Sequence, residues 1–255
     1  MSAETPANPR AVARAVAARF RWPWQRDYAR AKLSWDPAYA AVAGVLSESD
    51  VAVLDIGCGL GLLGFYLRER GYKGAYLGVD FDAPKIAEAQ RIARIAGMDL
   101  VFVDGDARAL PEFSGHVVLL DLLHYLQSTD QQMLLREAAA RVAESGVLIA
   151  RNVLRASGWR FHVTVLQERF IHAVRWMRSP PLHYPLRDEI EAPLRASGLD
   201  VDVRPLWGNT PFNSFLIVAR RGSRTPQEGG GLHPDAPRGT SRTIADEAAA
   251  TCRTP

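Results

Sequence analysis

The chain has 255 residues, of which 47% are hydrophobic and 23% are charged. This is the composition of an ordinary globular protein, and it excludes a disordered, fibrous or disulfide-stapled chain. The net charge of +3 divides unevenly. Residues 1–32 carry seven bases and two acids, residues 33–150 nine bases and sixteen acids, and residues 151–195 eight bases and four acids. Because the central segment is acidic, we do not expect the uniformly basic surface that is typical of nucleic-acid-binding proteins.

Cysteine usage and hydropathy bear on the compartment. The two cysteines, Cys58 and Cys252, lie far apart in the sequence, which favours reduced thiols. No apolar run approaches the roughly 18 residues of a membrane-spanning helix. We therefore expect a cytoplasmic protein without a membrane span.

From residue 51 onward, short apolar runs alternate with longer amphipathic stretches. The runs at 51–56, 75–80, 100–104, 116–121 and 146–151 predict β-strands with helices between them. This alternation is typical of right-handed β-α-β units on a parallel sheet.

Helix punctuation supports these assignments. Asp82 with Pro84 predicts the start of a helix that Gly97 closes. Ser128 with Gln131 has the pattern of a capping box, which predicts a helix start there and an end near residue 146.

The pattern changes after the fifth strand. Residues 157–178 predict a helix whose apolar stripe packs as core, and residues 186–197 predict another. Residues 201–205 and 212–220 are separated by a turn too short for a crossover helix, so they should pair as antiparallel strands. The stripe consists of Trp159, Val163, Leu166, Phe170, Val174 and Met177.

The strongest motif follows the first predicted strand. An apolar strand ends near Asp55, and Gly57, Gly59 and Gly61 then form a turn whose backbone can approach a ligand at the start of a helix. Together with Gly64, the last two glycines also satisfy the dinucleotide pattern G-x-G-x-x-G, which is weak evidence when it stands alone. The carboxylate ahead of the turn suits a ligand with an ammonium and a sulfonium better than a pyrophosphate.

The segment DIGCGLG at 55–61 resembles the first motif of class I S-adenosylmethionine-dependent methyltransferases, and three later segments match that family in order: YLGVDFD, VDGDARALP and VVLLDLLHYL. The resemblance implies that Asp80 binds both ribose hydroxyls, that Asp106 and the Ala107 amide meet the adenine, and that Asp121 lies beside the methionyl part and the donated methyl. The cofactor-binding residues that it implies are Asp55, Gly57, Cys58, Gly59, Gly61, Asp80, Phe81, Asp106, Ala107 and Asp121.

The same resemblance implies a seven-stranded Rossmann-like α/β fold of sheet order 3-2-1-4-5-7-6 with an antiparallel last strand. S-adenosyl-L-methionine would be the cofactor and S-adenosyl-L-homocysteine its product. We expect no metal, because the sequence shows no histidine, cysteine and carboxylate ligands clustered at a suitable spacing. We expect a basic helical cover at 1–49, a methyltransferase domain at 50–220 with a helical cap inserted at 157–195, and a disordered tail at 221–255.

The acceptor side is less specific. DLLHYL differs from the N/D-P-P-Y/F pattern that positions exocyclic amines, so methylation of adenine or glutamine is disfavoured. His124 lies at the carboxyl edge of the sheet, where acceptors bind in such folds, and could take a proton from a hydroxyl; Tyr125 is its predicted companion. A purely packing or capping role for His124 is an equal alternative.

Both basic segments flank the acceptor side. Tyr28, Arg30, Lys32 and Tyr39 are candidates for closing the site from the N-terminal cover, although a solvated basic face is the commoner arrangement. The cap arginines, such as Arg160, Arg169 and Arg175, have few acids nearby and predict an anionic acceptor or an acidic carrier protein.

A narrower resemblance concerns the acceptor. The segments YARAKLSWDPAY, DLLHYL, GWRFH and GNTPFNSFLIVA are similar to methyltransferases of bacterial aryl polyene pigment pathways. This implies secondary metabolism and a small aromatic or acyl-linked acceptor, carried on an acyl carrier protein.

Three other functions stay open on sequence grounds. They are an NAD(P)-dependent oxidoreductase, an RNA or DNA methyltransferase, and a non-catalytic S-adenosylmethionine-binding module. The acid at Asp80 does not separate the first from a methyltransferase, because dehydrogenases use a similarly placed acid. Binding that falls steeply with salt would mark the second.

Overall fold

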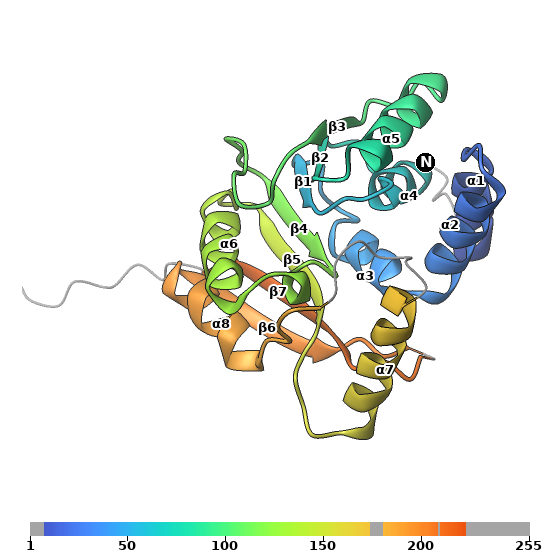
Figure 1. Cartoon of the computed structure of the whole chain (residues 1–255). Helices are drawn as coiled ribbons and strands as arrows, with labels where there is room; N and C mark the ends of the chain where they lie inside the picture. The colour runs from blue at the N-terminus through green and yellow to red at the C-terminus, as the bar shows by residue number, and fades with distance from the viewer. Residues whose placement is uncertain (1–7, 174–180, 209, 223–255) are drawn as a thin grey trace, which may run out of the picture. The chain divides into compact units, whose positions relative to one another are not determined.

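A computed structural model of the chain describes residues 8–173, 181–208 and 210–222. Within them, seven strands form one sheet of order β3-β2-β1-β4-β5-β7-β6 (Figure 1). The pairs among the first five strands are parallel, and β7 is antiparallel to both β5 and β6, which confirms the expected topology. The strands are β1 Val53–Ile56, β2 Tyr76–Asp80, β3 Val101–Asp104, β4 His116–Leu120, β5 Val147–Val153, β6 Leu199–Pro205 and β7 Ser214–Arg221.

The central strands of the sheet, β1, β2, β4 and β5, are buried on both faces, as their near-continuous apolar sequences require. In β4, Val118 joins the core under the N-terminal helices, whereas Val117 and Leu119 join the core under the opposite helices. The first core is covered by α1 Pro9–Ala18, α2 Pro23–Trp35, α3 Pro37–Val45, α4 Leu62–Glu69 and α5 Ala83–Ile95. The second is covered by α6 Ser128–Ala140 and α8 Arg187–Ala196, which pack together.

The capping-box prediction at α6 is wrong. Ser128 is the first residue of the helix, the N-cap is Gln127 without a side-chain cap, and the helix ends at Ala140 rather than near residue 146. The amide of Gln131 instead donates to the carbonyl oxygens of Leu123, Leu126 and His183. The Gln131 side chain therefore bonds to these carbonyl oxygens and not to the backbone at the start of α6, as a capping box would require.

Helix α7, Trp159–Ala173, begins the predicted cap. The described half of its expected apolar stripe is not core, because Trp159 is 62% exposed, Leu166 is 71% exposed and Val163 is only partly buried, whereas the polar Thr164 is buried. The Thr164 hydroxyl accepts a hydrogen bond from the Asn213 amide at 2.9 Å. The remainder of the predicted helix at 174–178, including Arg175, and the tail from 223 onward lie outside the described residues.

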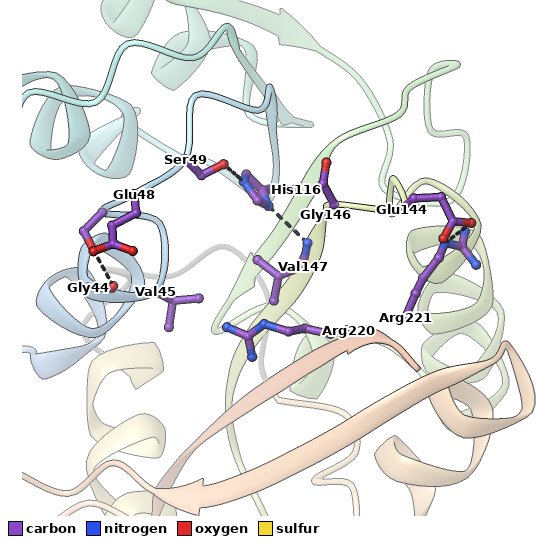
Figure 2. A pocket seen from close by; sticks show the side chains of 12 residues that line it. Gly44, Val45, Glu48, Ser49, His116, Glu144, Gly146, Val147, Arg220 and Arg221 are labelled. Atoms are coloured by element: carbon purple, nitrogen blue, oxygen red, sulfur yellow. Dashed lines mark hydrogen bonds and ion pairs between the residues drawn. The ribbon is translucent and has the colours of Figure 1, made fainter. Parts of the chain in front are cut away.

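A cavity of about 400 Å³ lies at the amino ends of β4 and β5, away from the glycine turn (Figure 2). His116 borders it and is buried there. The imidazole Nδ1 accepts the Val147 amide at 3.0 Å, and Nε2 lies 2.7 Å from the Ser49 hydroxyl. Because an acceptor nitrogen carries no proton, His116 is the neutral Nε2–H tautomer.

His116→Asn should flatten the acid dependence of stability. Burial, with Arg220 adding to it, lowers the pKa of His116, whereas in the unfolded chain a histidine titrates near 6.5. As pH falls below that value only the unfolded state gains the proton, so the free energy of unfolding drops by up to about 1.4 kcal/mol per pH unit. Asn retains an acceptor for the Val147 amide but does not titrate.

Urea unfolding of both proteins at pH 7.5 and 5.5 measures this difference. The wild type should lose more stability between the two pH values than the variant does. An equal loss in both proteins would contradict a neutral His116.

Candidate active site

The glycine turn after β1 has the geometry of a ligand cradle. Gly57, Gly59 and Gly61 have φ values of 79°, 55° and 72°, a left-handed conformation that glycine adopts without steric cost. A Cβ on Gly59 would meet nothing within 4 Å, whereas one on Gly61 would lie 2.6 Å from the Phe102 ring. Gly59 therefore leaves its backbone open to a ligand, and Gly61 allows α4 to pack closely against the sheet.

Asp80 ends β2 directly beside this turn. Its Oδ2 accepts the Gly59 amide at 2.8 Å and its Oδ1 accepts the Asp82 amide at 2.9 Å. These bonds fix the carboxylate while each oxygen keeps a further lone pair. The next side chain, Phe81, is 60% exposed. The oriented Asp80 carboxylate could bind the hydroxyls of a ribose, and the exposed Phe81 ring could pack against the attached base.

Asp55 lies beneath the turn rather than on its open side. Its carboxyl is buried, and Oδ2 accepts the Tyr76 hydroxyl at 2.5 Å. Burial raises the pKa of Asp55 to about 7, Asp80 adds to the rise, and the Tyr76 hydrogen bond opposes it. Cys58 is likewise buried, and its Sγ would lie 2.8 Å from a Cβ on Gly78. Both side chains support the turn from below.

Asp106 and Ala107 follow β3 at the surface. The Asp106 carboxylate is held by the Arg108 guanidinium, whose Nη2 lies 2.5 Å from Oδ2, and by the Arg108 amide at 2.9 Å. These contacts lower the pKa of Asp106. The Ala107 amide donates to no group in the described parts of the chain, so it is open to an acceptor such as an adenine ring nitrogen.

Four charged side chains meet at the carboxyl ends of β4 and β5, and we call Lys32, Asp36, Asp121 and Arg151 the ion cluster. Lys32 Nζ lies 2.8 Å from Asp36 and 3.1 Å from Asp121, and Arg151 pairs with Asp121 and lies 3.8 Å from Asp36. The cluster joins α2 and the α2–α3 junction to two strand ends. It holds two positive and two negative charges.

The cluster controls the charge states of its members. Burial disfavours the charged form of Asp121, but Arg151 and Lys32 outweigh it and hold the pKa of Asp121 well below its usual range. Burial likewise opposes the charge on Lys32, yet Asp121 and Asp36 raise the pKa of the amine. Asp121, Lys32 and Arg151 are therefore charged at neutral pH.

His124 follows Asp121 in a 3₁₀ turn, Leu123–Tyr125, and is 1% exposed. Its Nδ1 lies 3.0 Å from Asn152 Oδ1. The ring stacks on Tyr184 at 9° with centroids 5.9 Å apart, and the Tyr125 centroid lies 4.2 Å away. The predicted pair of His124 and Tyr125 is thus together, under residues 182–184, whose amides at Leu182 and His183 donate to the His124 carbonyl.

Of the predicted cover residues, two reach the site region. Lys32 belongs to the ion cluster, and Tyr39 is buried against the Tyr66 ring. Arg30 does not reach the site, since it pairs with Asp27 on the exposed face of α2. Tyr28 packs against the core beneath the N-terminal helices.

Of the three cap arginines named above, the structure describes the side chain of Arg160. Arg160 donates to the Thr210 carbonyl at 2.6 Å, and its guanidinium lies over the Trp159 and Trp207 rings at 4.8 and 4.6 Å. It therefore ties α7 to the β6–β7 connection. The side chain of Arg169 lies outside the described residues.

Sequence reasoning missed Asp36, Arg151 and Asn152. Asp36 precedes Pro37 and has the pattern of an N-cap, a role that it also fills by accepting the Ala38 amide at 3.0 Å. Arg151 and Asn152 interrupt an apolar strand near its carboxyl end. Two polar residues at that edge of a parallel sheet were the available signal.

Residues 53–146 match the family model described as a methyltransferase domain. A demethylmenaquinone methyltransferase of Thermus thermophilus is 37% identical over 71 residues, which are 28% of this chain and 32% of that protein. The chain aligns with about a third of the length of the curated relatives it matches.

Solved structures share the fold. Magnesium protoporphyrin IX methyltransferase from Synechocystis, with bound SAH, superposes with a TM-score of 0.60 at 19% identity, covering 85% of this chain and 96% of that one. The [4+2]-cyclase SpnF superposes with a TM-score of 0.57 at 19% identity, covering 83% and 91%.

The sequence match and the sheet topology point to the same class. Residues 53–146 are similar to a methyltransferase domain, and the whole sheet has the strand order of the class I S-adenosylmethionine-dependent methyltransferase fold. The cofactor of this class is S-adenosylmethionine, and the open Gly59 backbone with the oriented Asp80 carboxylate fits its ribose end.

Two further findings concern the described residues alone. No three histidine, cysteine, aspartate or glutamate side chains gather there as a metal site. No helix among them is both long and apolar enough to cross a bilayer.

Lys32→Met should loosen the cover from the strand ends, because Asp36 and Asp121 lose their shared cation. Lys32 is partly buried, so the loss of unfolding free energy should fall between the ~1 kcal/mol of an exposed pair and the ~3–5 kcal/mol of a fully buried one. Arg30→Met, on the exposed face of the same helix, is the matched control and should cost less than about 0.5 kcal/mol. Urea unfolding of the two variants measures both. Equal costs would show that the ion cluster adds nothing.

Proposed function

We propose that the chain transfers a methyl group from S-adenosylmethionine to a small aromatic or acyl-linked acceptor. The observation that carries the proposal is the juxtaposition, along one sheet edge, of the open glycine turn with Asp80 and of the ion cluster with His124. The carboxyl edge of a parallel sheet is where such folds bind ligands. When bound, S-adenosylmethionine supplies an electrophilic methyl group on a sulfonium.

In this proposal, some residues along the edge bind the methyl donor and others face the methyl acceptor. Asp80 and Phe81 bind the ribose and adenine, the Ala107 amide and Asp106 contact the base, and Asp121 marks the end of the site nearest the donated methyl. His124, at the start of the next segment, lies on the acceptor side as the proton acceptor. The chain's main contribution is alignment of the two partners and exclusion of water.

The acceptor is an anion or carries a carbonyl oxygen. The Arg151 side chain is 11% exposed, and its Nε is a buried atom with no hydrogen-bond partner in the described parts of the chain. A buried donor without a partner is costly, so an acceptor oxygen placed there would be favoured. A carboxylate on an aromatic or polyene acid meets this requirement, as does the thioester carbonyl of the same acid.

An acyl carrier protein presents the acceptor in this proposal. The support is the basic N-terminal segment, whose Arg10 and Arg14 are exposed on α1, because acidic partners are steered by such charge. Turnover of free arylic acids and of their carrier-protein thioesters should be compared with methyl-labelled cofactor. Faster turnover of the thioesters at low salt would support carrier presentation, and preference for the free acids would refute it.

Fold alone does not establish methyl transfer, since a [4+2]-cyclase shares it. Calorimetry with S-adenosylmethionine and with NADH separates a methyltransferase from an oxidoreductase. Label that moves from the cofactor to an acceptor separates catalysis from cofactor binding alone. Binding of NADH without S-adenosylmethionine would overturn the proposal.

Asp80→Asn should weaken S-adenosylmethionine binding. The carboxylate would lose charge-assisted bonds to ribose hydroxyls, and such bonds contribute about 1.5–3 kcal/mol, which corresponds to about a 10- to 150-fold rise in Kd. Asp104→Asn is the matched control, because Asp104 pairs in register with Asp80 at the neighbouring strand end and is exposed. Calorimetric titration should find Kd unchanged in the control. An unchanged Kd in Asp80→Asn would remove Asp80 from the cofactor site.

A further inference from the structure

We propose that Asn152 is a positioning residue that fixes His124 as the Nδ1–H tautomer, so that Nε2 carries the lone pair that accepts a proton. The catalytic meaning of this assignment rests on the proposed methyl transfer and on an acceptor that is methylated at a hydroxyl. The tautomer itself does not depend on it and can be measured in the protein without cofactor or acceptor.

The orientation of the Asn152 amide follows from its second hydrogen bond. Asn152 is fully buried on β5, and its Nδ2 donates to the Val153 carbonyl at 2.8 Å. A flipped amide would bring two acceptor oxygens together there, so the nitrogen must face that carbonyl. The amide oxygen therefore faces His124 Nδ1, at 3.0 Å.

This orientation determines which nitrogen of His124 is protonated. An amide oxygen can only accept a hydrogen bond, so the His124 nitrogen facing it must donate. In a neutral imidazole the other nitrogen then has no proton and is a base. The parallel Tyr184 ring and the neighbouring Tyr125 ring hold the imidazole plane in place.

The proton balance of the reaction is complete with this base. The acceptor oxygen forms a bond to the methyl carbon while the sulfur–methyl bond breaks, and the sulfonium becomes a neutral thioether. The hydroxyl proton passes to His124 Nε2. One positive charge leaves the sulfur and one appears on the imidazole, so no oxidant, reductant or further reactant is required.

His116 provides an internal reference of the opposite kind. Its Nδ1 accepts the Val147 amide, so its proton is on Nε2. His116 and His124, which are buried at opposite ends of β4, should therefore show opposite tautomers in one sample. If the measurement finds the expected Nε2–H form of His116, its result for His124 has a control within the same molecule.

Long-range ¹H–¹⁵N spectra of histidine-labelled protein test the assignment, with His124→Gln and His116→Asn identifying the two sets of signals. We expect His124 as Nδ1–H and His116 as Nε2–H in the wild type. In Asn152→Leu, which keeps volume but removes the acceptor, His124 should become a tautomer mixture while His116 is unchanged. An Nε2–H form of His124 in the wild type, or an unchanged His124 in Asn152→Leu, would overturn the proposal.

Kinetics then separate this inference from the proposed function. With a hydroxyl acceptor, Asn152→Leu should lower kcat by about 10- to 100-fold, part of the share that general-base catalysis contributes, with the Kd of S-adenosylmethionine unchanged. Asn152→Asp should recover turnover and move the acidic limb of the kcat profile up by about one to three pH units, because the new carboxylate favours the imidazolium. If His124→Gln turns over as fast as the wild type, the base role fails although the tautomer assignment stands.

Discussion

The ion cluster and the segment that carries His124 depend on how Asp121 is held. It follows β4 with φ of 58°, the one positive value outside glycine among the described residues, a conformation that costs an ordinary residue about 1–2 kcal/mol. Arg151 offsets that cost through both its backbone and its side chain, since its carbonyl accepts the Asp121 amide at 2.9 Å and its guanidinium pairs with the carboxylate. The turn at Asp121 then directs the chain into the segment that carries His124. Backbone strain of this kind is commonly found at functional sites.

The sheet was predictable because its signals are local. Strand β2, expected at 75–80 and found at Tyr76–Asp80, follows a glycine at position 74, and its apolar run matches a strand buried on both faces. The capping-box prediction for α6 was wrong for a non-local reason. The Gln131 side chain, which a capping box would need at the helix start, donates instead to the carbonyl of His183, 52 positions away in the sequence.

In the candidate site, too, residues with local sequence signals were predictable and residues that depend on distant partners were not. Strand-end acids such as Asp80 were predictable because they follow their own strands, as the family motifs require. The pairing of Asp36 with Arg151 was not, because 115 positions separate them and Asp36 already has a sufficient local role as an N-cap. Asn152 was missed because its function depends on the orientation of its amide, which is a property of two hydrogen bonds rather than of residue type.

Each of the two basic segments contributes one base to the ion cluster, and neither base is left uncompensated. Lys32 comes from the first and Arg151 from the second, and Asp36 and Asp121 balance both. An anionic acceptor would therefore have to share these cations with the cluster's own carboxylates. Because that competition costs part of the Coulomb energy, the ion cluster should select the shape and hydrogen-bonding pattern of the acceptor more than its charge. The buried Arg151 Nε, which no described residue satisfies, is the donor that such an acceptor can use without breaking an existing pair.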